Sequence, residues 1–344
     1  MKSKIAFIAG TRPELIKLAP VINLMNPYVI FTGQHFDKNM SDDFFNLLKC
    51  DEIVNLDFNP SVSQNYTKDM TKEIASSLKE LKIDKVVVQG DTNTTLAGGV
   101  AAKSINKLLY YIESGLRTYD FSQVEEYNRV IVSHLADFNF CNHITNKQNL
   151  INESIDNKKI NVTGSTVYSS VKQVKLDVKE INDKEYILLT LHRPENVDNL
   201  DRLNEIMEAI NSLNFQTIFP VHPRTKNMLN LKQNKYENIS FVEPQEYEVF
   251  LNMARNSKFI ISDSGGLQEE AAILRKPLLI PREFTERPEM LNKFNLLVPT
   301  PKELISESSK LINNRSELLV SIENSNLLYG EDEVITKIVN IINS

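Results

Sequence analysis

The chain has 344 residues, enough for about two domains that each bury a core of their own. Hydrophobic residues form 41% of it and charged residues 24%, a composition typical of globular proteins, and the formal net charge is −6. This charge argues against a general nucleic-acid-binding protein, and no apolar run approaches the roughly 20 residues that cross a bilayer, so neither nucleic acid nor membrane is expected as a partner.

Short apolar segments alternate along the chain with amphipathic helical patterns. Most of the segments are apolar throughout, as expected of parallel strands that are covered on both faces. The strand-like segments are residues 4–10, 28–33, 85–90, 108–113, 137–142, 161–164, 186–192, 217–222, 239–244, 259–263 and 277–282. The helical patterns are residues 14–25, 67–81, 92–106, 125–136, 200–213, 246–256 and 267–276. This alternation predicts an α/β protein with parallel sheets.

One polar and charged stretch, residues 170–184, interrupts the series, and a new strand-like segment follows it. We interpret the stretch as a linker between a first domain, residues 1–170, and a second domain, residues 171–325. From residue 301 onward the pattern is mainly helical.

The first residues and the cysteines indicate the compartment. The N-terminal segment MKSKIAFIAGTRPE reaches charge and proline too early for a signal peptide. Cys50 and Cys141 lie far apart and match no metal-site spacing, which fits packed thiols in a reducing compartment. We therefore expect a soluble cytoplasmic protein.

Small and polar residues follow most of the predicted strands directly. In open parallel sheets, ligands bind beyond the carboxyl ends of the strands. The eight loops of this kind are Gly10-Thr-Arg-Pro, Gly33-Gln-His, Gly90-Asp-Thr, Glu113-Ser-Gly, His192-Arg-Pro, His222-Pro-Arg, Ser262-Asp-Ser-Gly-Gly and Pro281-Arg-Glu. Because each carries Asp, Glu, His, Arg or Gly, we expect one polar site at the mouth of two facing sheets.

The loop at Ser264, Gly265 and Gly266 has the chemistry of an anion site. It opens a predicted helix, where free backbone N–H groups and the helix dipole favour a phosphate. The helix also carries Glu269 and Glu270, one of which could accept hydrogen bonds from ribose hydroxyls. A capped helix start with solvated carboxylates fits the same residues equally well.

Residues 10–14 form a similar turn after the first strand. The turn lacks the G-x-G-x-x-G spacing, so NAD binding is not supported. Arg12 and Lys17 could face a diphosphate from here, although Lys17 by itself is more simply explained as a solvated helix residue.

Three carboxylates, Asp91, Glu113 and Glu125, are expected near the mouth of the N-terminal sheet. Carboxylates that are brought together or screened from water can act as acids or bases near neutral pH. Structural alternatives stay open: Asp91 is a good N-cap for the next helix, and Glu125 can pair with Arg129 at i,i+4.

Among the five histidines, His192 and His222 follow strands and precede loops that carry arginine, as phosphate ligands do. His-Glu-x-x-His and clustered Cys/His motifs are missing from the sequence, so no metal is expected. No serine lies in a G-x-S-x-G motif, which leaves serine nucleophile chemistry without support.

Ten segments in order resemble the non-hydrolysing UDP-N-acetylglucosamine 2-epimerase family of bacteria and archaea. Single segments are weak evidence, whereas the ordered series is specific and covers nearly the whole chain. They are GTRPELIKLAP (10–20), TGQH (32–35), GDTNTTLAG (90–98), ESGLRT (113–118), EEYNR (125–129), VTGSTV (162–167), HRPEN (192–196), PVHPR (220–224), SDSGGLQEEA (262–271) and ERPE (286–289).

The resemblance implies a GT-B-like fold of two Rossmann-like domains whose parallel sheets face a central cleft. It also implies that a C-terminal helix, residues 326–344, packs back on the N-terminal domain, and that the protein is a homodimer. The implied reaction is reversible inversion at C2 of a UDP-N-acetylhexosamine, typically UDP-GlcNAc to UDP-ManNAc, for cell-surface polysaccharide synthesis. It proceeds through elimination of UDP and a 2-acetamidoglucal, without NAD or metal.

Residue roles follow from the motif match. Asp91, Glu113 and Glu125 are the candidate acids and bases, and His192 is a further catalytic candidate that would act on the departing diphosphate. The diphosphate and UDP ligands implied are His192, Arg12, Lys17, His222, Arg224, Ser264, Gly265, Gly266 and Arg282, with Glu270 on the ribose. A possible activator pocket contains Gln34, His35 and Arg193.

The chain departs from the family pattern near the acids. It has Ser114 where the family commonly has alanine, and Val124 where a proline usually precedes the paired acids. The loop after Gly33 is similar to that of relatives acting on modified sugars, such as fucosamine or diacetamido-uronate nucleotides. Further alternatives are a GT-B glycosyltransferase, a hydrolysing epimerase and a catalytically silent sugar-nucleotide sensor.

Overall fold

The structure is a computed structural model that describes residues 3–33, 48–56, 58, 65–174, 185–221, 223–229 and 235–344. The chain divides into two compact units. Unit 1 contains Met1–Ser170 and Leu328–Ser344, and unit 2 contains Val171–Leu327. Of the predicted linker, residues 170–184, the first residues belong to helix α7, Val167–Gln173, and residues 175–184 lie outside the described residues.

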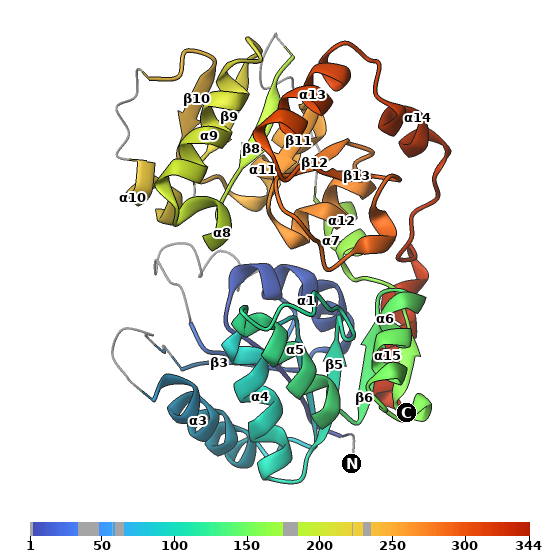
Figure 1. Cartoon of the computed structure of the whole chain (residues 1–344). Helices are drawn as coiled ribbons and strands as arrows, with labels where there is room; N and C mark the ends of the chain where they lie inside the picture. Colours follow the sequence, from blue (N-terminus) through green and yellow to red (C-terminus); the bar gives the residue numbers. More distant parts are fainter. Residues whose placement is uncertain are drawn as a thin grey trace. The chain divides into compact units, whose positions relative to one another are not determined.

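Unit 1 is built on a parallel sheet with the strand order β3-β2-β1-β4-β5-β6-β7. Figure 1 labels β3, β5 and β6 of this sheet. The strands are β1 Ile5–Ala9, β2 Tyr28–Phe31, β3 Glu52–Asn55, β4 Lys85–Gln89, β5 Leu108–Ile112, β6 Phe138–Cys141 and β7 Ile160–Val162. The helices are α1 Arg12–Met25, α3 Tyr66–Glu80, α4 Asn93–Ser104, α5 Val124–Leu135, α6 Ile144–Asn152, α7 Val167–Gln173 and α15 Glu333–Asn343.

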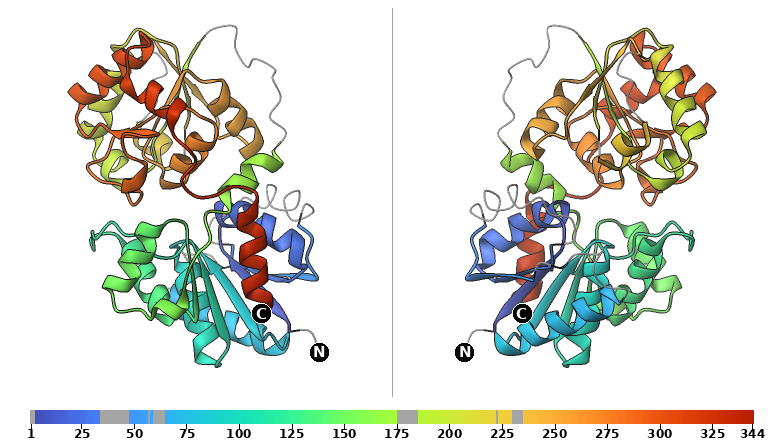
Figure 2. Two further views of the ribbon diagram at one scale, coloured as in Figure 1. Left: turned by 90° about the vertical axis from the view of Figure 1, so that its right-hand side faces the viewer. Right: turned by 90° about the vertical axis from the view of Figure 1, so that its left-hand side faces the viewer.

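Apolar side chains cover both faces of this sheet, as the continuous apolar pattern of its strands predicts. In β1, Ile5, Phe7 and Ala9 pack with α1 and α15 on one face. The alternate residues Ala6 and Ile8 pack with α3, α4 and α5 on the other face. The last helix of the chain therefore completes the core of the first unit, and Figure 2 shows it beside the sheet.

Unit 2 repeats the design with a sheet in the order β10-β9-β8-β11-β12-β13, again parallel throughout its described pairs. The strands are β8 Ile187–Thr190, β9 Thr217–Pro220, β10 Ile239–Val242, β11 Phe259–Ser262, β12 Leu278–Ile280 and β13 Asn295–Leu297. The helices are α8 Pro194–Val197, α9 Leu200–Asn211, α10 Pro223–Leu229, α11 Tyr247–Asn256, α12 Gly265–Ile273, α13 Pro301–Ile312 and α14 Glu317–Asn324.

The strand orders confirm the predicted α/β class with two Rossmann-like sheets. In each sheet the order reverses between the first strand and its neighbour, at β1/β4 in unit 1 and at β8/β11 in unit 2. Ligands of such sheets bind at the carboxyl ends beside this switch point. The loops after these four strands are therefore where a site is expected.

Two strands escape the sequence prediction. β3 and β13 lie at sheet edges and are four and three residues long. β3 is only partly buried, with the exposed residues Glu52 and Asn55 at its ends. Short edge strands have little apolar pattern, because only one neighbour and one partial face contact them. None of the helices in the described part of the chain combines the length and apolar character needed to span a bilayer.

Candidate active site

The turn after β1 is organised by the carboxylate of Glu14. Thr11 caps α1, and Glu14 closes a capping box, with its Oε2 accepting from the N–H of Thr11 at 2.8 Å. The same oxygen accepts from the N–H of Gly10 at 2.9 Å. The N–H of Thr11, at the cap, is one of the groups that a bound anion could use at a helix start. Because Glu14 occupies this N–H, a diphosphate at this turn would depend on the side chains of Arg12 and Lys17.

The second oxygen of Glu14 reaches the other side of the switch point. Its Oε1 accepts from Thr92 Oγ1 at 2.8 Å and lies 3.2 Å from Thr95 Oγ1, both in the first turn of α4 or its cap. Burial raises the pKa of Glu14, although the donors from Gly10, Thr92 and Thr11 act against this shift. One carboxylate thus joins the loops after β1 and β4.

Glu113 follows β5 and is almost fully buried. Its backbone has a φ of 66°, a left-handed conformation that is uncommon for a residue with a side chain and is typical of functional sites. Lys17 Nζ donates to both carboxylate oxygens, at 2.8 and 3.0 Å, and Gln89 Nε2 donates to Oε2. The structure therefore brings together the predicted acid Glu113 and the predicted diphosphate ligand Lys17 as an ion pair.

Asp91 is not the N-cap of α4. The cap is Thr92, whose hydroxyl accepts from the N–H of Thr95 at 3.2 Å. Asp91 instead accepts from Arg129 of α5, with 2.5 Å between Oδ2 and the guanidinium nitrogen, and its carbonyl oxygen accepts from Asn128 at 2.8 Å. The Thr92 hydroxyl caps α4 because the Arg129 guanidinium binds the Asp91 carboxylate.

The two adjacent acids of α5 have different surroundings. Glu126 is fully buried and accepts from the N–H groups of Thr118 and Tyr119, at 3.1 and 2.9 Å, and from Arg129 at 2.8 Å. Glu125 is half-buried, and no hydrogen bond or ion pair joins it to another described residue. The i,i+4 interpretation is therefore wrong, because Arg129 pairs with Glu126 at i,i+3, a spacing that is also adjacent on a helix surface. The Glu125 carboxylate stays available to a ligand.

Ser114, where the family pattern has alanine, joins a buried polar network behind Glu113. Its hydroxyl donates to Asn139 Oδ1 at 2.7 Å and lies 3.2 Å from Ser133 Oγ. Arg117 donates to Ser133 Oγ at 3.2 Å. The Ser114 hydroxyl thus has polar partners on α5 and β6. Serine in place of alanine therefore changes the contacts next to Glu113, and Glu113 itself is kept.

In unit 2 a buried carboxylate again spans the switch point. Asp263, at the end of β11, accepts from the backbone N–H groups of His192 and Arg193 at 3.1 and 3.0 Å and from Asn196 Nδ2 at 3.1 Å. Its Oδ1 also lies 3.1 Å from His192 Nδ1. Burial by itself would raise the pKa of Asp263, but the hydrogen bonds from His192, Arg193 and Asn196 outweigh burial and lower it. The imidazole of His192 is thereby held through Nδ1.

The start of α12 differs from the start of α1. Ser264 caps the helix by accepting from the N–H of Leu267 at 3.4 Å. Among the described residues nothing accepts from the N–H groups of Gly265 and Gly266. A Cβ on Gly265 would lie 1.9 Å from Glu286 Oε1, whereas a Cβ on Gly266 would meet nothing within 4 Å. This helix start can therefore offer backbone donors to an anion.

The two glutamates of α12 are not both solvated. Glu269 is buried and forms an ion pair with Arg287 at 2.8 Å. Glu270 is half-buried, and its Oε1 accepts from the hydroxyl of Tyr247 at 2.9 Å. Burial and the neighbouring Glu270 raise the pKa of Tyr247, so this hydroxyl keeps its proton. The solvated-carboxylate interpretation is thus wrong for Glu269.

Arg282 is buried, and its guanidinium forms ion pairs with two glutamates of the chain. Its guanidinium lies 3.1 Å from Glu195 Oε1 and 3.3 Å from Glu286 Oε2. Glu286 also pairs with Arg287 at 3.1 Å. A role of Arg282 as a UDP ligand stays a prediction. Its ion pair with Glu286 indicates that Arg282 helps to fix the Glu286 side chain next to Gly265.

Several predicted ligands cannot be placed. Gln34, His35 and His222 lie outside the described residues, and Arg224 belongs to α10, where its side chain is also outside them. Arg193 is half-buried, and its N–H is one of the donors to Asp263. The activator pocket therefore stays a prediction.

Three supporting carboxylates were not predicted from the sequence: Glu14, Glu126 and Asp263. A signal for Glu14 was present, because Thr11-Arg-Pro-Glu14 has the T-x-x-E spacing of a capping box with proline in the first turn. For Asp263 the signal is a charged residue directly after an apolar strand, which needs partners if it is buried. Glu126 has no such signal, because either of two adjacent acids can face inward.

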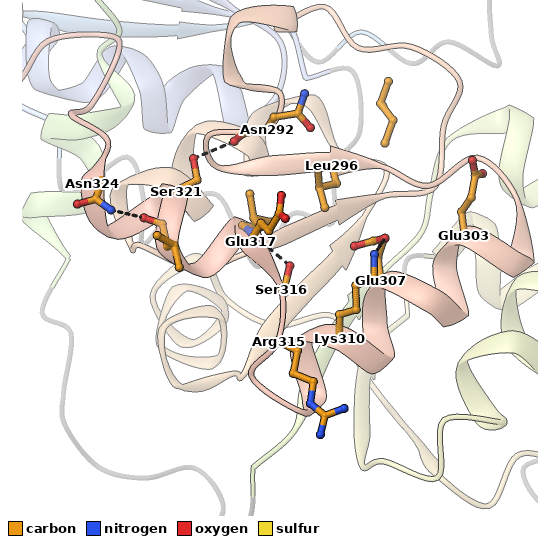
Figure 3. Close-up of a pocket in the computed structure, with 13 residues that line it drawn as sticks. Asn292, Leu296, Glu303, Glu307, Lys310, Arg315, Ser316, Glu317, Ser321 and Asn324 are labelled. Carbon is orange, nitrogen blue, oxygen red and sulfur yellow. Dashed lines mark hydrogen bonds and ion pairs between the residues drawn. The ribbon is translucent and has the colours of Figure 1, made fainter.

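A hollow of about 800 Å³ lies in unit 2 between β13, α13 and α14 (Figure 3). Its lining includes Glu303, Glu307, Lys310, Arg315 and Ser321. None of the predicted site residues lines it, and it is therefore separate from the switch point. Among the described residues there is also no group of three or more His, Cys, Asp or Glu placed to hold a metal ion.

Comparison with known proteins bears on both units. Residues 23–343 match the family model described as UDP-N-acetylglucosamine 2-epimerase. A UDP-N-acetylglucosamine 2-epimerase of Methanococcus maripaludis is 39% identical over 98% of this chain and 98% of its own. The crystal structure of Methanocaldococcus jannaschii UDP-GlcNAc 2-epimerase in complex with UDP-GlcNAc and UDP has a TM-score of 0.87 at 37% identity, over 98% of this chain and 99% of that chain. A UDP-2,3-diacetamido-2,3-dideoxy-D-glucuronate 2-epimerase of Pseudomonas aeruginosa is 32% identical over 97% of this chain and 98% of its own.

Proposed function

Because the chain belongs to the UDP-N-acetylglucosamine 2-epimerase family and has its GT-B-like fold, we propose that it interconverts UDP-N-acetylglucosamine and UDP-N-acetylmannosamine. The reaction inverts C2 of the sugar and leaves the nucleotide unchanged overall. We further propose that it supplies a precursor of cell-surface polysaccharide, and that the enzyme works in the cytoplasm as a homodimer.

The proposed route avoids direct inversion at C2. The C2 proton is not beside a carbonyl group, so it is only weakly acidic. A base removes this proton while the bond from C1 to the diphosphate oxygen breaks, and UDP leaves behind a 2-acetamidoglucal with a C1–C2 double bond. An acid then delivers a proton to the opposite face of C2, and the UDP oxygen forms the C1 bond again. Acid/base groups are needed on both faces.

The carboxylates of unit 1 supply these groups. Glu113 and Asp91 follow adjacent strands, and each is held by a cation, Lys17 or Arg129. Glu125 has no partner among the described residues. Together they offer two oriented carboxylates and one unengaged carboxylate, which fits proton removal and delivery by different groups.

The departing UDP needs preorganised donors. Unit 2 supplies the N–H groups of Gly265 and Gly266 and the imidazole of His192, which Asp263 orients. In unit 1, Arg12 and Lys17 remain the candidate cations for the diphosphate. Glu270 is the candidate ribose ligand, and its hydrogen bond from Tyr247 orients one oxygen of its carboxylate.

The observation that carries the proposal is the placement of Glu113 and Asp91 at the ends of β5 and β4, beside the switch point. A glycosyltransferase of the same fold acts at C1 and needs at most one base. A sensor needs no acids at all. Two positioned carboxylates therefore support chemistry at C2.

The test is proton NMR of the purified protein with UDP-N-acetylglucosamine in D2O. We expect deuterium at C2 and the appearance of UDP-N-acetylmannosamine. Free UDP with N-acetylmannosamine would assign the hydrolysing reaction instead. Absence of exchange would exclude this substrate.

A modified sugar nucleotide is the second candidate, because the Pseudomonas aeruginosa relative is named for a diacetamido-glucuronate substrate. A panel containing UDP-N-acetylfucosamine and a UDP-diacetamido-uronate separates the candidates. The substrate with the highest kcat/KM for C2 exchange identifies the preferred hexosamine.

A further inference from the structure

The carboxylate of Glu14 is 5% exposed and receives hydrogen bonds from two different loops. Gly10 N, Thr11 N and Thr11 Oγ1 donate to Oε2 at 2.9, 2.8 and 2.9 Å. Thr92 Oγ1 donates to Oε1 at 2.8 Å, and Thr95 Oγ1 lies 3.2 Å away. A capping box needs only the first set of these contacts. The second set is an additional link across the switch point.

The backbone of Gly10 is also in tight contact with the side chain of Thr94 in α4. A Cβ on Gly10 would lie 2.0 Å from Thr94 Oγ1 and 2.7 Å from Thr32 Oγ1, so only glycine fits there. The contact lets the Glu14 carboxylate reach α4 without a longer side chain. The loop with Arg12 and the loop with Asp91 are therefore packed as one piece at this point.

The link continues to the next acid. The Thr95 hydroxyl, which lies beside Glu14 Oε1, gives its single proton to the carbonyl oxygen of Gln89 at 2.7 Å, and the Gln89 side chain donates to Glu113. Lys17, one turn after Glu14 on α1, binds the same Glu113 carboxylate. Helix α1 therefore holds the loops after β4 and β5 through two side chains on one face.

We propose that Glu14 is a positioning residue for the C2 reaction. Its carboxylate holds the loop of Arg12 and the loop of Asp91 in a fixed relation, so that the diphosphate ligand and the acid/base group keep their spacing during elimination and re-addition. This inference rests on the proposed function. It predicts that the Oε1 link to α4 contributes to turnover separately from the stability that the capping box supplies.

Four variants separate the two roles of Glu14. Glu14→Ala removes both links. Thr95→Val keeps the capping box and the Thr92 contact, and removes the hydroxyl through which the link continues from Glu14 Oε1 to Gln89 and Glu113. Glu14→Gln keeps the shape, since its amide oxygen can accept from the two N–H groups and its NH2 can donate to the Thr92 hydroxyl. Glu303→Ala, in the capping box that Thr300 and Glu303 form on α13, is the matched control away from the site.

The readouts are kcat and KM for C2 exchange per folded enzyme, UDP affinity by calorimetry, and Tm. Small displacements of reacting groups can cost large factors in rate, and we expect kcat to fall about 10-fold or more in Glu14→Ala and roughly 5-fold in Thr95→Val. Glu14→Gln should recover most of kcat. Glu303→Ala should lower Tm with kcat unchanged. UDP affinity should change less than kcat in Thr95→Val, since the variant leaves Arg12 and unit 2 in place.

The outcomes are distinguishable. If the wild type exchanges C2 deuterium but Thr95→Val and Glu14→Ala keep the kcat of Glu303→Ala, the positioning role is wrong and Glu14 is a cap only. If Glu14→Ala does not fold, Thr95→Val decides alone. If the wild type exchanges no sugar of the panel, the proposed function fails and the inference fails with it.

Discussion

At the residue scale, a buried carboxylate joins the two loops of each switch point. Glu14 connects the loops after β1 and β4, and Asp263 connects the loops after β11 and β8. Each is surrounded by N–H and O–H donors, which is how a protein keeps a buried carboxylate stable. Both side chains support a neighbouring predicted site residue and have no role of their own in the predicted chemistry.

Asp263→Asn should therefore disable His192 without removing it. The introduced amide would place an NH2 group where the Asp263 carboxylate accepts hydrogen bonds. Either the hydrogen bond from Arg193 or Asn196 is lost, or His192 must accept a hydrogen bond at Nδ1. Because the wrong tautomer or orientation of a catalytic imidazole is costly, kcat should fall by roughly 100-fold. Kinetics of C2 exchange test this. The exposed Asp201→Asn is the matched control, and an equal effect of both variants would contradict it.

The same variant has a defined pH dependence. The folded-state pKa of Asp263 is lowered from its ordinary value of 3.8, so its stabilisation is fully present above pH 3.8 and is lost as the pH falls through the lowered value. The Tm difference between wild type and Asp263→Asn should therefore shrink on acidification below about pH 4. Calorimetry over this range measures it, and a difference that grows would be the opposite of the expected sign.

Residue types alone do not decide which of two adjacent candidates fills a position. Asp91 and Thr92 are both good caps, and the hydroxyl caps α4 because Arg129, distant in the sequence, binds the carboxylate. Glu125 and Glu126 differ only in orientation, which depends on where α5 begins. The candidate acids were predictable from their loops, whereas their partners were not, since each partner comes from another element.

At the element scale, the start of α12 combines two glycines with different surroundings. Gly265 lies against the buried Glu286, which is paired with Arg287 and Arg282. Gly266 has open space where its side chain would be. The first glycine is needed for packing, and the second keeps the approach to the backbone N–H groups open.

Gly265→Ala should therefore lower stability, whereas Gly266→Ala should weaken UDP binding. The methyl on Gly265 must displace a buried, ion-paired carboxylate, and we expect about 1–3 kcal/mol of destabilisation. Gly266→Ala should leave Tm unchanged or slightly raised, because alanine favours a helix, but should weaken UDP binding. Denaturation curves and calorimetric UDP titrations measure the two effects. Equal losses of stability would refute the distinction.

The elements that the sequence did not predict have weak local signals. All the predicted strands are confirmed, and the interior ones are buried on both faces, which makes them continuous apolar runs. The unpredicted β3 and β13 are short, and most of their residues are partly buried or exposed, so they lack a continuous apolar run. Helix α6 begins at a cap made by His143, a residue that is rarely used as a cap.

At the scale of the whole molecule, unit 1 is formed by both ends of the chain. Val334, Ile335, Ile338 and Ile342 of α15 pack in one core with α1 and the sheet. The buried Lys85 of β4 donates to the carbonyl oxygen of Ile342 at 2.6 Å, near the C-terminus of α15, where the helix dipole favours a cation. Unit 2 is a continuous segment between the two parts of unit 1.

Ile338→Ala should destabilise unit 1 selectively. Ile338 is fully buried, and removing its side chain leaves a cavity, for which we expect a cost of about 2–5 kcal/mol. Hydrogen exchange should show lost protection in β1, β4 and α1, with β8 and β11 unaffected. The control is Ile305→Ala on α13, where the side chain is 37% exposed and the cost should be under about 1 kcal/mol. Loss of protection in both units would contradict this independence.

The interrupted order of unit 1 also bears on how the protein is made. Synthesis proceeds from the N-terminus at about 5–20 residues per second, so α15 is released roughly ten to thirty seconds after the last strand of the first sheet. Throughout that interval the apolar face around Phe7 lacks the buried side chains of α15 that complete its core. Unit 2 is translated in full before α15. The first unit to be translated is thus the last to be completed, and a chaperone that shields exposed apolar surface has its longest opportunity there.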